Sequence, residues 1–297
     1  MSTPLHIGWI GTGVMGLSMA GHLRAAGHPL TIYNRTKAKA QPLLDAGAQW
    51  ADTPAAVAAA SDVVFSIVGF PKDVEDVILG PQGALQGLKP GGIVCDMTTS
   101  SPELAARIAE AAAAKGCAGA DAPVTGGDIG AREARLSIFV GGDEATYQRL
   151  LPCLQHMGKT VVHCGPAGAG QKAKLANQIA IAGVMFSTCE SMLFAQEAGL
   201  DVRQWVETVI PGAAGSTAMA TLGRRIVGGD FEPGFYVEHF LKDLGLCMDE
   251  CRRMGLVLPG LAAAEQAYRA LVAQGYGKKG TQVLIKGLAA VSAKQWK

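Results

Sequence analysis

The sequence predicts an α/β protein with two domains: a parallel β-sheet flanked by helices, then an all-helical domain, the two joined by a long helix. In the first half, short β-branched runs alternate with helical stretches, which is the pattern of βαβ units. After Cys164, a glycine-rich segment at residues 165–170 leads into long helical patterns with almost no strand signal. We therefore expect one domain at residues 1–164 and a second at residues 165–297.

The first half contains both strand and helix signals. Residues 62–68 are nearly all Val, Ile and Phe, as expected for a strand covered on both faces. Gly27 and Gly47 end two helices, and Ser101 caps a third that has Pro102 in its first position. The expected helices cover residues 15–26 and 36–46, and a third starts at residue 101. The expected strands cover residues 5–10, 29–33, 62–68, 92–97, 118–124, 136–140 and 161–164.

The second half is expected to be helical throughout. Its longest apolar stretch, residues 176–194, contains Asn177, Gln178 and Glu190, which are poorly suited to a membrane span, so we interpret it as a buried helix. We expect its helices at residues 171–198, 202–209, 216–226, 237–254, 261–274 and 286–294.

Composition narrows the functional classes. The 297 residues are 49% hydrophobic and 17% charged, with a formal net charge of +1. This profile is typical of a globular protein and gives no general attraction to nucleic acid or to anionic membranes. Seven cysteines without a C-x-x-C pair, together with an N-terminus that lacks the pattern of a signal peptide, favour reduced thiols and a cytoplasmic location. Cys247 and Cys251 have no third ligand nearby, so we expect no metal site.

A glycine motif follows the first expected strand. The pattern G-x-G-x-x-G opens a helix there, and this context makes it a strong sign of a dinucleotide site in a Rossmann domain. The first glycine allows the tight turn, the second lets the backbone approach the pyrophosphate, and the third packs helix on strand. The alternative is a tight strand-to-helix turn that uses glycines for geometry alone. The expected cofactor-binding residues are Gly11, Thr12, Gly13, Val14, Met15 and Gly16.

The end of the second strand indicates which dinucleotide binds. An NAD site has Asp or Glu here to accept a hydrogen bond from the ribose, but this chain has Asn34, Arg35 and Thr36. Without a carboxylate a 2′-phosphate is not repelled, and a guanidinium can bind it. We expect NADP(H), with NAD(H) as the alternative cofactor. The alternative to phosphate binding by Arg35 is that its side chain is a solvated charge on a loop.

Four separated blocks resemble the β-hydroxyacid dehydrogenase family, and they occur in the family's order over nearly the whole chain. This family includes 3-hydroxyisobutyrate dehydrogenase, tartronate semialdehyde reductase and the glyoxylate/succinic semialdehyde reductases. The blocks are GWIGTGVMG at residues 8–16, DAPVTGG at 121–127, GAGQKAKLANQ at 168–178 and KDL at 242–244.

The resemblance implies that Lys174 is the catalytic acid/base. Hydride delivered to a carbonyl carbon builds negative charge on the oxygen, which needs a proton donor nearby. Asn177 and Gln178 lie three and four residues further along a helix and share its face with Lys174. We expect Asn177 to orient the substrate or the lysine, with Gln178 in support. The alternative for Lys174 is a surface lysine beside Lys172.

The resemblance also implies a carboxylate site at Thr125, Gly126 and Gly127, where consecutive N–H groups and a hydroxyl form an anion-binding turn. The family commonly has serine in place of Thr125, and the added methyl group narrows the pocket. A plain strand-ending turn is the alternative.

Three further positions are expected to contact ligands. By resemblance, Lys242 approaches the nicotinamide or the substrate carboxylate, and Thr99 contacts the cofactor near the nicotinamide. Val68, at the carboxyl end of a strand, is expected to line the adenosine side. Asp243, which follows Lys242, is expected to cap a helix or to pair with a nearby residue.

These features together predict an NADPH-dependent reductase of a small aldehydic or keto acid, with tartronate semialdehyde, glyoxylate and succinic semialdehyde as candidate substrates. One alternative is an NAD-dependent dehydrogenase of the 3-hydroxyisobutyrate type, and another is a non-catalytic NADP-binding scaffold.

The apolar helices of the second half offer more hydrophobic surface than one small domain can bury. We therefore expect a homodimer or homotetramer.

Overall fold

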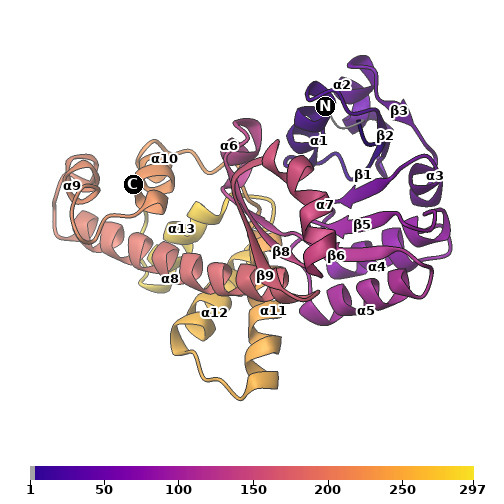
Figure 1. The fold of residues 1–297 in the computed structure, drawn as a ribbon. Helices are drawn as coiled ribbons and strands as arrows, with labels where there is room; N and C mark the ends of the chain where they lie inside the picture. Colours follow the sequence, from indigo (N-terminus) through magenta and orange to yellow (C-terminus); the bar gives the residue numbers. More distant parts are fainter. Residues whose placement is uncertain (1–3) are drawn as a thin grey trace. The chain divides into compact units, whose positions relative to one another are not determined.

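The computed structural model describes residues 4–297, and the chain divides by its internal contacts into two compact units, Met1–Lys174 and Leu175–Lys297 (Figure 1). The border between the units lies inside one long helix, α8 (Ala169–Glu197). The border expected from the sequence lies earlier, at the end of the last strand, β9 (Gly158–Gly165). The observed fold class is the predicted one: a mostly parallel sheet with helices, followed by a helical domain.

The first unit is built on one sheet whose strands β3-β2-β1-β4-β5-β6 are parallel and lie in this order. This is the strand order of a Rossmann domain, in which ligands bind at the carboxyl ends of the strands. These strands are β1 (Ile7–Ile10), β2 (Leu30–Tyr33), β3 (Gln49–Trp50), β4 (Val63–Ser66), β5 (Ile93–Asp96) and β6 (Ala118–Asp121).

The far edge of the sheet departs from the expected parallel arrangement. Strand β8 (Leu136–Gly141) pairs antiparallel with β6 and with β7 (Val124–Thr125), and parallel with β9. Only residues 126–135 connect β7 to β8, and a parallel crossover needs roughly a dozen residues or more. The short connection therefore enforces a hairpin-like reversal.

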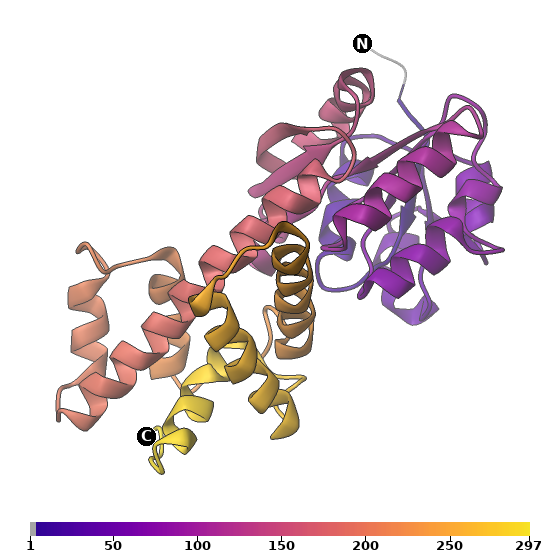
Figure 2. The same cartoon turned by 90° about the horizontal axis from the view of Figure 1, so that it is seen from below.

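Helices cover both faces of this sheet (Figure 2). Alternate residues of β1 serve the two faces: Ile7 and Trp9 join one buried cluster, whereas Ile10 joins the other. The helical segments are α1 (Gly16–Ala25), η1 (Lys37–Ala40), α2 (Gln41–Asp45), α3 (Pro54–Ala59), α4 (Pro71–Leu79), η2 (Ala84–Gln86), α5 (Pro102–Ala113), α6 (Gly127–Arg132) and α7 (Glu144–Gln155).

Two local predictions can be compared with these helices. The Ser101 hydroxyl accepts a hydrogen bond from the Leu104 N–H at 3.0 Å, which confirms the predicted cap of α5. The single helix expected at residues 36–46 is instead a 3₁₀ segment followed by α2. Pro42 has no N–H to donate to the preceding turn, so a continuous α-helix through this region would lack a hydrogen bond.

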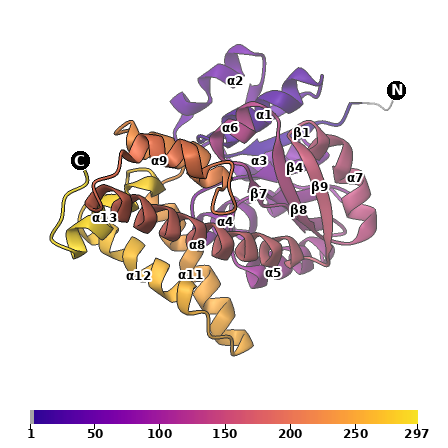
Figure 3. The same cartoon turned by 90° about the vertical axis from the view of Figure 1, so that its left-hand side faces the viewer.

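The second unit is helical, with α9, α11, α12 and α13 gathered along the part of α8 that follows Lys174 (Figure 3). By length and composition alone α8 could cross a membrane, a test that core helices also pass. Its Met185, Cys189 and Met192 are buried in the core of this unit with Phe240 and Tyr268. The remaining segments are α9 (Val202–Val209), a π-helical turn η3 (Met219–Gly223), α10 (Arg224–Val227), α11 (Val237–Met254), α12 (Pro259–Ala273), η4 (Thr281–Val283) and α13 (Leu284–Val291).

Candidate active site

The loop between β1 and α1 uses its three glycines in three different ways. Gly11 has φ of 101°, and a Cβ placed there would lie 2.1 Å from the carbonyl oxygen of Ile67. A Cβ on Gly16 would lie 2.0 Å from the carbonyl oxygen of Gly11. At Gly13 a Cβ would meet no atom within 4 Å, so the backbone is open to a ligand there. These differences match the roles expected from the motif: Gly11 allows the tight turn, Gly16 allows close packing, and Gly13 leaves room for the pyrophosphate.

Thr12 provides a second sign of a ligand in this loop. Its hydroxyl oxygen is buried and has no hydrogen-bond partner among the described residues, which is costly for a polar group unless a ligand or water completes it. The open backbone at Gly13 and the free N–H groups at the start of α1 supply the remaining donors that a pyrophosphate needs. The residues present therefore fit a dinucleotide.

The end of β2 is tied to this loop through Asn34. Its amide oxygen accepts a hydrogen bond from the Thr12 N–H at 3.0 Å, and its amide nitrogen donates to the Thr36 carbonyl at 2.8 Å. Asn34 thus supports the glycine loop, a role that the sequence did not suggest. The Arg35 side chain is 88% exposed, and its guanidinium lies 3.6 Å from the carboxylate of Asp73 on α4. The guanidinium is therefore accessible to a phosphate.

A buried carboxyl links the carboxyl ends of β4 and β5. Oδ1 of Asp96 accepts hydrogen bonds from the hydroxyls of Ser66 and Thr98, each at 2.8 Å. The Thr98 hydroxyl in turn accepts from the Val68 N–H at 2.9 Å. Burial raises the pKa of Asp96 to about 7, although these hydrogen bonds pull it down. The network fixes Val68 and the loop that contains Thr99, both expected to contact the cofactor.

Thr125 ends β7, and the two glycines after it adopt backbone conformations that other residues rarely take. Gly126 has φ of 131° and Gly127 has φ of 65°. A Cβ on Gly126 would also lie 3.2 Å from the Leu136 side chain, whereas a Cβ on Gly127 would meet nothing within 4 Å. The turn is therefore open at Gly127, where α6 begins. An open, glycine-rich turn of this kind can present N–H groups to an anion.

Lys174 is the last residue of the first unit and lies on the second turn of α8, where the residue is 6% exposed. The start of α8 is attached to the sheet: Asp121, at the end of β6, accepts hydrogen bonds from the N–H groups of Gly168 and Gln171. Burial raises the pKa of Asp121, while these hydrogen bonds oppose the shift. The helix that carries the expected acid/base is thus anchored within the nucleotide-binding unit.

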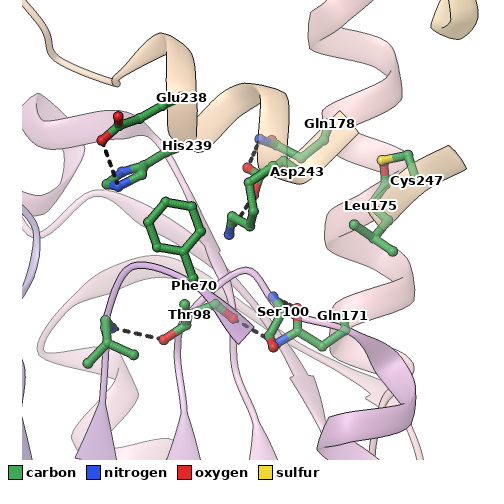
Figure 4. Close-up of polar contacts among 12 residues, drawn as sticks. Phe70, Thr98, Ser100, Gln171, Leu175, Gln178, Glu238, His239, Asp243 and Cys247 are labelled. Atoms are coloured by element: carbon green, nitrogen blue, oxygen red, sulfur yellow. Dashed lines mark hydrogen bonds and ion pairs between the residues drawn. The ribbon is translucent and has the colours of Figure 1, made fainter. Parts of the chain in front are cut away.

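Four polar residues form a connected cluster in the second unit. The Asn177 amide donates to Gln178 at 2.9 Å. Figure 4 shows the next contact, in which the Gln178 amide donates to Oδ2 of Asp243 at 2.6 Å. Oδ1 of Asp243 pairs with the Lys242 ammonium at 2.8 Å, the local pairing expected from the sequence. The side chains of Lys242 and Asp243 are only 13% and 1% exposed. Lys242 and Asn177, both expected site residues, therefore belong to one polar network.

The predicted nucleotide contacts other than Lys242 lie in the first unit. Gly11–Gly16, Asn34–Thr36, Val68 and Thr99 follow the carboxyl ends of β1, β2, β4 and β5, which are neighbouring parallel strands. They therefore share one edge of the sheet. Asp96, Asp121 and Asp73 were missed by sequence reasoning, although the first two end apolar strands and could have been suspected on that ground. Among residues 4–297, no three His, Cys, Asp or Glu side chains form a cluster that could hold a metal ion.

Comparisons with known proteins agree with this geometry. Residues 6–165 match the family model described as the NAD binding domain of 6-phosphogluconate dehydrogenase. Residues 168–288 match the model described as NAD-binding of NADP-dependent 3-hydroxyisobutyrate dehydrogenase. Together the two models cover nearly the whole chain.

Similar proteins extend the match along the chain. A probable 3-hydroxyisobutyrate dehydrogenase-like 1, mitochondrial, from Arabidopsis thaliana is 56% identical over 95% of this chain and 84% of its own length. The 2-hydroxy-3-oxopropionate reductase of Escherichia coli strain K12 is 35% identical over 96% of this chain and 97% of its own. A solved structure, Psf3 in complex with NADP⁺ and 2-OPP, has a TM-score of 0.88 at 26% identity over 95% of this chain and 99% of that one.

The glycine loop, the Rossmann strand order and these matches agree over both units. The chain is thus an NAD(P)-dependent oxidoreductase, and it belongs to the β-hydroxyacid dehydrogenase family.

Proposed function

We propose that this enzyme uses NADPH to reduce a small aldehydic or keto acid, with Lys174 as the acid/base. The observation that carries the proposal is the placement of Lys174, nearly buried on a helix whose start is hydrogen-bonded to Asp121 at the end of β6, within the unit that contains the glycine loop. Candidate substrates are tartronate semialdehyde, glyoxylate and succinic semialdehyde. Membership in a family of oxidoreductases disfavours the non-catalytic scaffold.

The preference for NADPH rests on the end of β2. Asn34 is occupied with Thr12 and Thr36, no carboxylate follows the strand, and the exposed Arg35 can form charge-assisted hydrogen bonds with a 2′-phosphate. The weak pairing of Arg35 with Asp73 at 3.6 Å does not prevent this, because an exposed ion pair contributes at most about 1 kcal/mol.

The chemistry assigned to the chain is positioning and proton transfer. When bound, the reduced nicotinamide supplies a hydride. Lys174 gives its proton to the carbonyl oxygen as negative charge develops there, and in the reverse direction it removes the proton from the hydroxyl. Thr125, Gly126 and Gly127 bind the substrate carboxylate through a hydroxyl and backbone N–H groups. We assign Asn177 to orientation of the reacting groups and Lys242 to ligand binding, both from the family resemblance.

The test compares Lys174→Ala with Lys172→Ala, which removes an exposed lysine from the same helix. NADPH oxidation is measured with each candidate acid. General acid–base catalysis contributes roughly 10²–10⁴-fold, so kcat should fall by that factor in Lys174→Ala and stay unchanged in Lys172→Ala. Equal turnover by the wild-type enzyme and Lys174→Ala would exclude the assigned mechanism.

A second candidate is NAD-dependent oxidation of a 3-hydroxy acid such as 3-hydroxyisobutyrate. The name of the Arabidopsis thaliana relative favours it. Rates with NADH and NADPH, measured with the same substrates in both directions, distinguish the two: a higher kcat/KM with NADH and 3-hydroxyisobutyrate would replace the preferred proposal.

A further inference from the structure

The start of α8 is capped by a carboxylate from the sheet. Asp121 is fully buried, and its two oxygens accept hydrogen bonds from the N–H groups of Gly168 at 2.6 Å and Gln171 at 2.7 Å. N–H groups at the start of a helix lack partners within the helix, and the helix dipole favours a negative charge there. Asp121 therefore fixes the N-terminal end of α8 at the carboxyl end of β6.

The backbone itself lies against the sheet at this point. A Cβ on Gly170 would lie 2.3 Å from the carbonyl oxygen of Phe139 and 2.7 Å from Oδ2 of Asp121. A Cβ on Gly141 would lie 2.4 Å from Oδ1 of the same carboxylate. Only glycines permit this approach, so the first turn of α8 has little freedom to shift along β8.

The Gln171 side chain adds a second attachment, to the loop after β5. Its amide oxygen accepts a hydrogen bond from the Ser100 N–H at 2.9 Å, and its amide nitrogen donates to the Thr98 carbonyl at 2.8 Å (Figure 4). The side chain is fully buried. One amide thus satisfies a donor and an acceptor that flank Thr99. An ionised carboxylate can only accept, and an alkyl group can do neither.

We propose that Gln171, held by Asp121, is a positioning residue that fixes Lys174 relative to the loop carrying Thr99. The inference rests on the proposed role of Lys174 as acid/base. Lys174 lies three residues after Gln171, on the same face of the helix. Since one helical turn is rigid, the hydrogen bonds of Gln171 determine where the lysine side chain starts. A misplacement of about 1 Å at a reacting group can cost roughly 100-fold in rate.

Gln171→Leu removes both hydrogen bonds at nearly constant volume. We expect kcat to fall about 10- to 100-fold, while the dissociation constant of the nucleotide, measured by fluorescence titration, changes less than about twofold. The matched control is Gln148→Leu, which removes an exposed glutamine from α7 and should leave kcat unchanged. Wild-type kcat in Gln171→Leu, or a loss explained by weaker nucleotide binding, would overturn the proposal.

The double variant separates positioning of Lys174 from a general structural role. In a Lys174→Ala background, Gln171→Leu should cause no further loss of kcat beyond about twofold, because residues acting through one group are not additive. A further loss as large as in the wild-type background would overturn the proposal. Full activity of Lys174→Ala alone would instead refute the acid/base assignment, so the two failures are distinguishable.

Gln171→Glu provides a second variant that keeps the shape of the side chain. A protonated carboxyl can donate to Thr98 and accept from Ser100, as the amide does, whereas the ionised form repels the Thr98 carbonyl. The ratio of kcat in this variant to wild-type kcat should therefore fall as pH rises from about 5 to about 9. Asp96 and Asp121 are the titratable groups hydrogen-bonded to this helix start and loop, and both are present in the two proteins. A ratio near one throughout would overturn the proposal.

Discussion

Asp96 shows how a residue without a catalytic role can make stability depend on pH. Its pKa is about 7 in the folded protein, against an ordinary value of 3.8, and burial is the main cause. Between about pH 4 and pH 7, the folded state therefore keeps a proton that the unfolded state has already released. The contribution of Asp96 to the free energy of unfolding is present in full below pH 4 and is lost as pH rises through 7.

We predict that Asp96→Asn flattens this dependence. The amide keeps the shape and the acceptor oxygen for Ser66 and Thr98 but does not titrate in this range. Between pH 5 and pH 8 the wild-type protein should lose more free energy of unfolding than the variant, by up to the order of 3 kcal/mol. Urea unfolding followed by tryptophan fluorescence measures this, with the exposed Asp45→Asn as control. Parallel pH profiles for the wild type and Asp96→Asn would contradict it.

Residues whose roles depend on near neighbours were predictable, and those whose partners are distant were not. The three glycines of the β1–α1 loop could be assigned because turn, approach and packing all lie within six residues. No structural role was predicted for Asp96 or Asp121, because their partners, Ser66 and Gly168, are 30 and 47 residues away. Only the folded sheet shows that these carboxyls lie beside the expected nucleotide contacts.

At the scale of elements, the junction of α8 with the sheet allows a direct comparison of two glycines. We predict that Gly170→Ala destabilises the protein by more than 1 kcal/mol, because its Cβ would press on the Phe139 carbonyl and the buried Asp121. Gly21→Ala, on α1 in the same unit, meets only an ordinary contact at 3.9 Å and should stabilise by about 0.5–1 kcal/mol. Thermal unfolding compares them; equal midpoints would show that the backbone relaxes at Gly170.

Most strands and the helices of the second half were predicted with limits within a few residues, whereas several elements of the first half were missed. Residues 237–254 were expected as one helix and form α11. Helices α3, α4 and α7 were not predicted, although Thr53 and Asp143 cap two of them through side-chain hydrogen bonds. The antiparallel β8 could not be deduced from its own residues, because its direction is set by the length of the connection to β7.

At the scale of the whole molecule, exposed apolar side chains in the second unit support the predicted homo-oligomer. Phe194, Val257 and Val291 are 75%, 85% and 82% exposed. We predict a homodimer or homotetramer at micromolar concentration, formed largely through this unit, because such side chains are stabilised by removal from water. Light scattering should give a multiple of the 30.6 kDa chain mass, and a value near 30.6 kDa would contradict the prediction.

The capping of α8 by Asp121 also limits how the enzyme can be divided. A fragment that stops with the sheet at Gly165 would lack the N–H groups of Gly168 and Gln171. It would leave an interior acidic group without the donors that compensate its removal from water, a costly defect in any protein interior. Recombinant versions of the nucleotide-binding half, or chimaeras that exchange it between relatives, should therefore be joined beyond the first turns of α8.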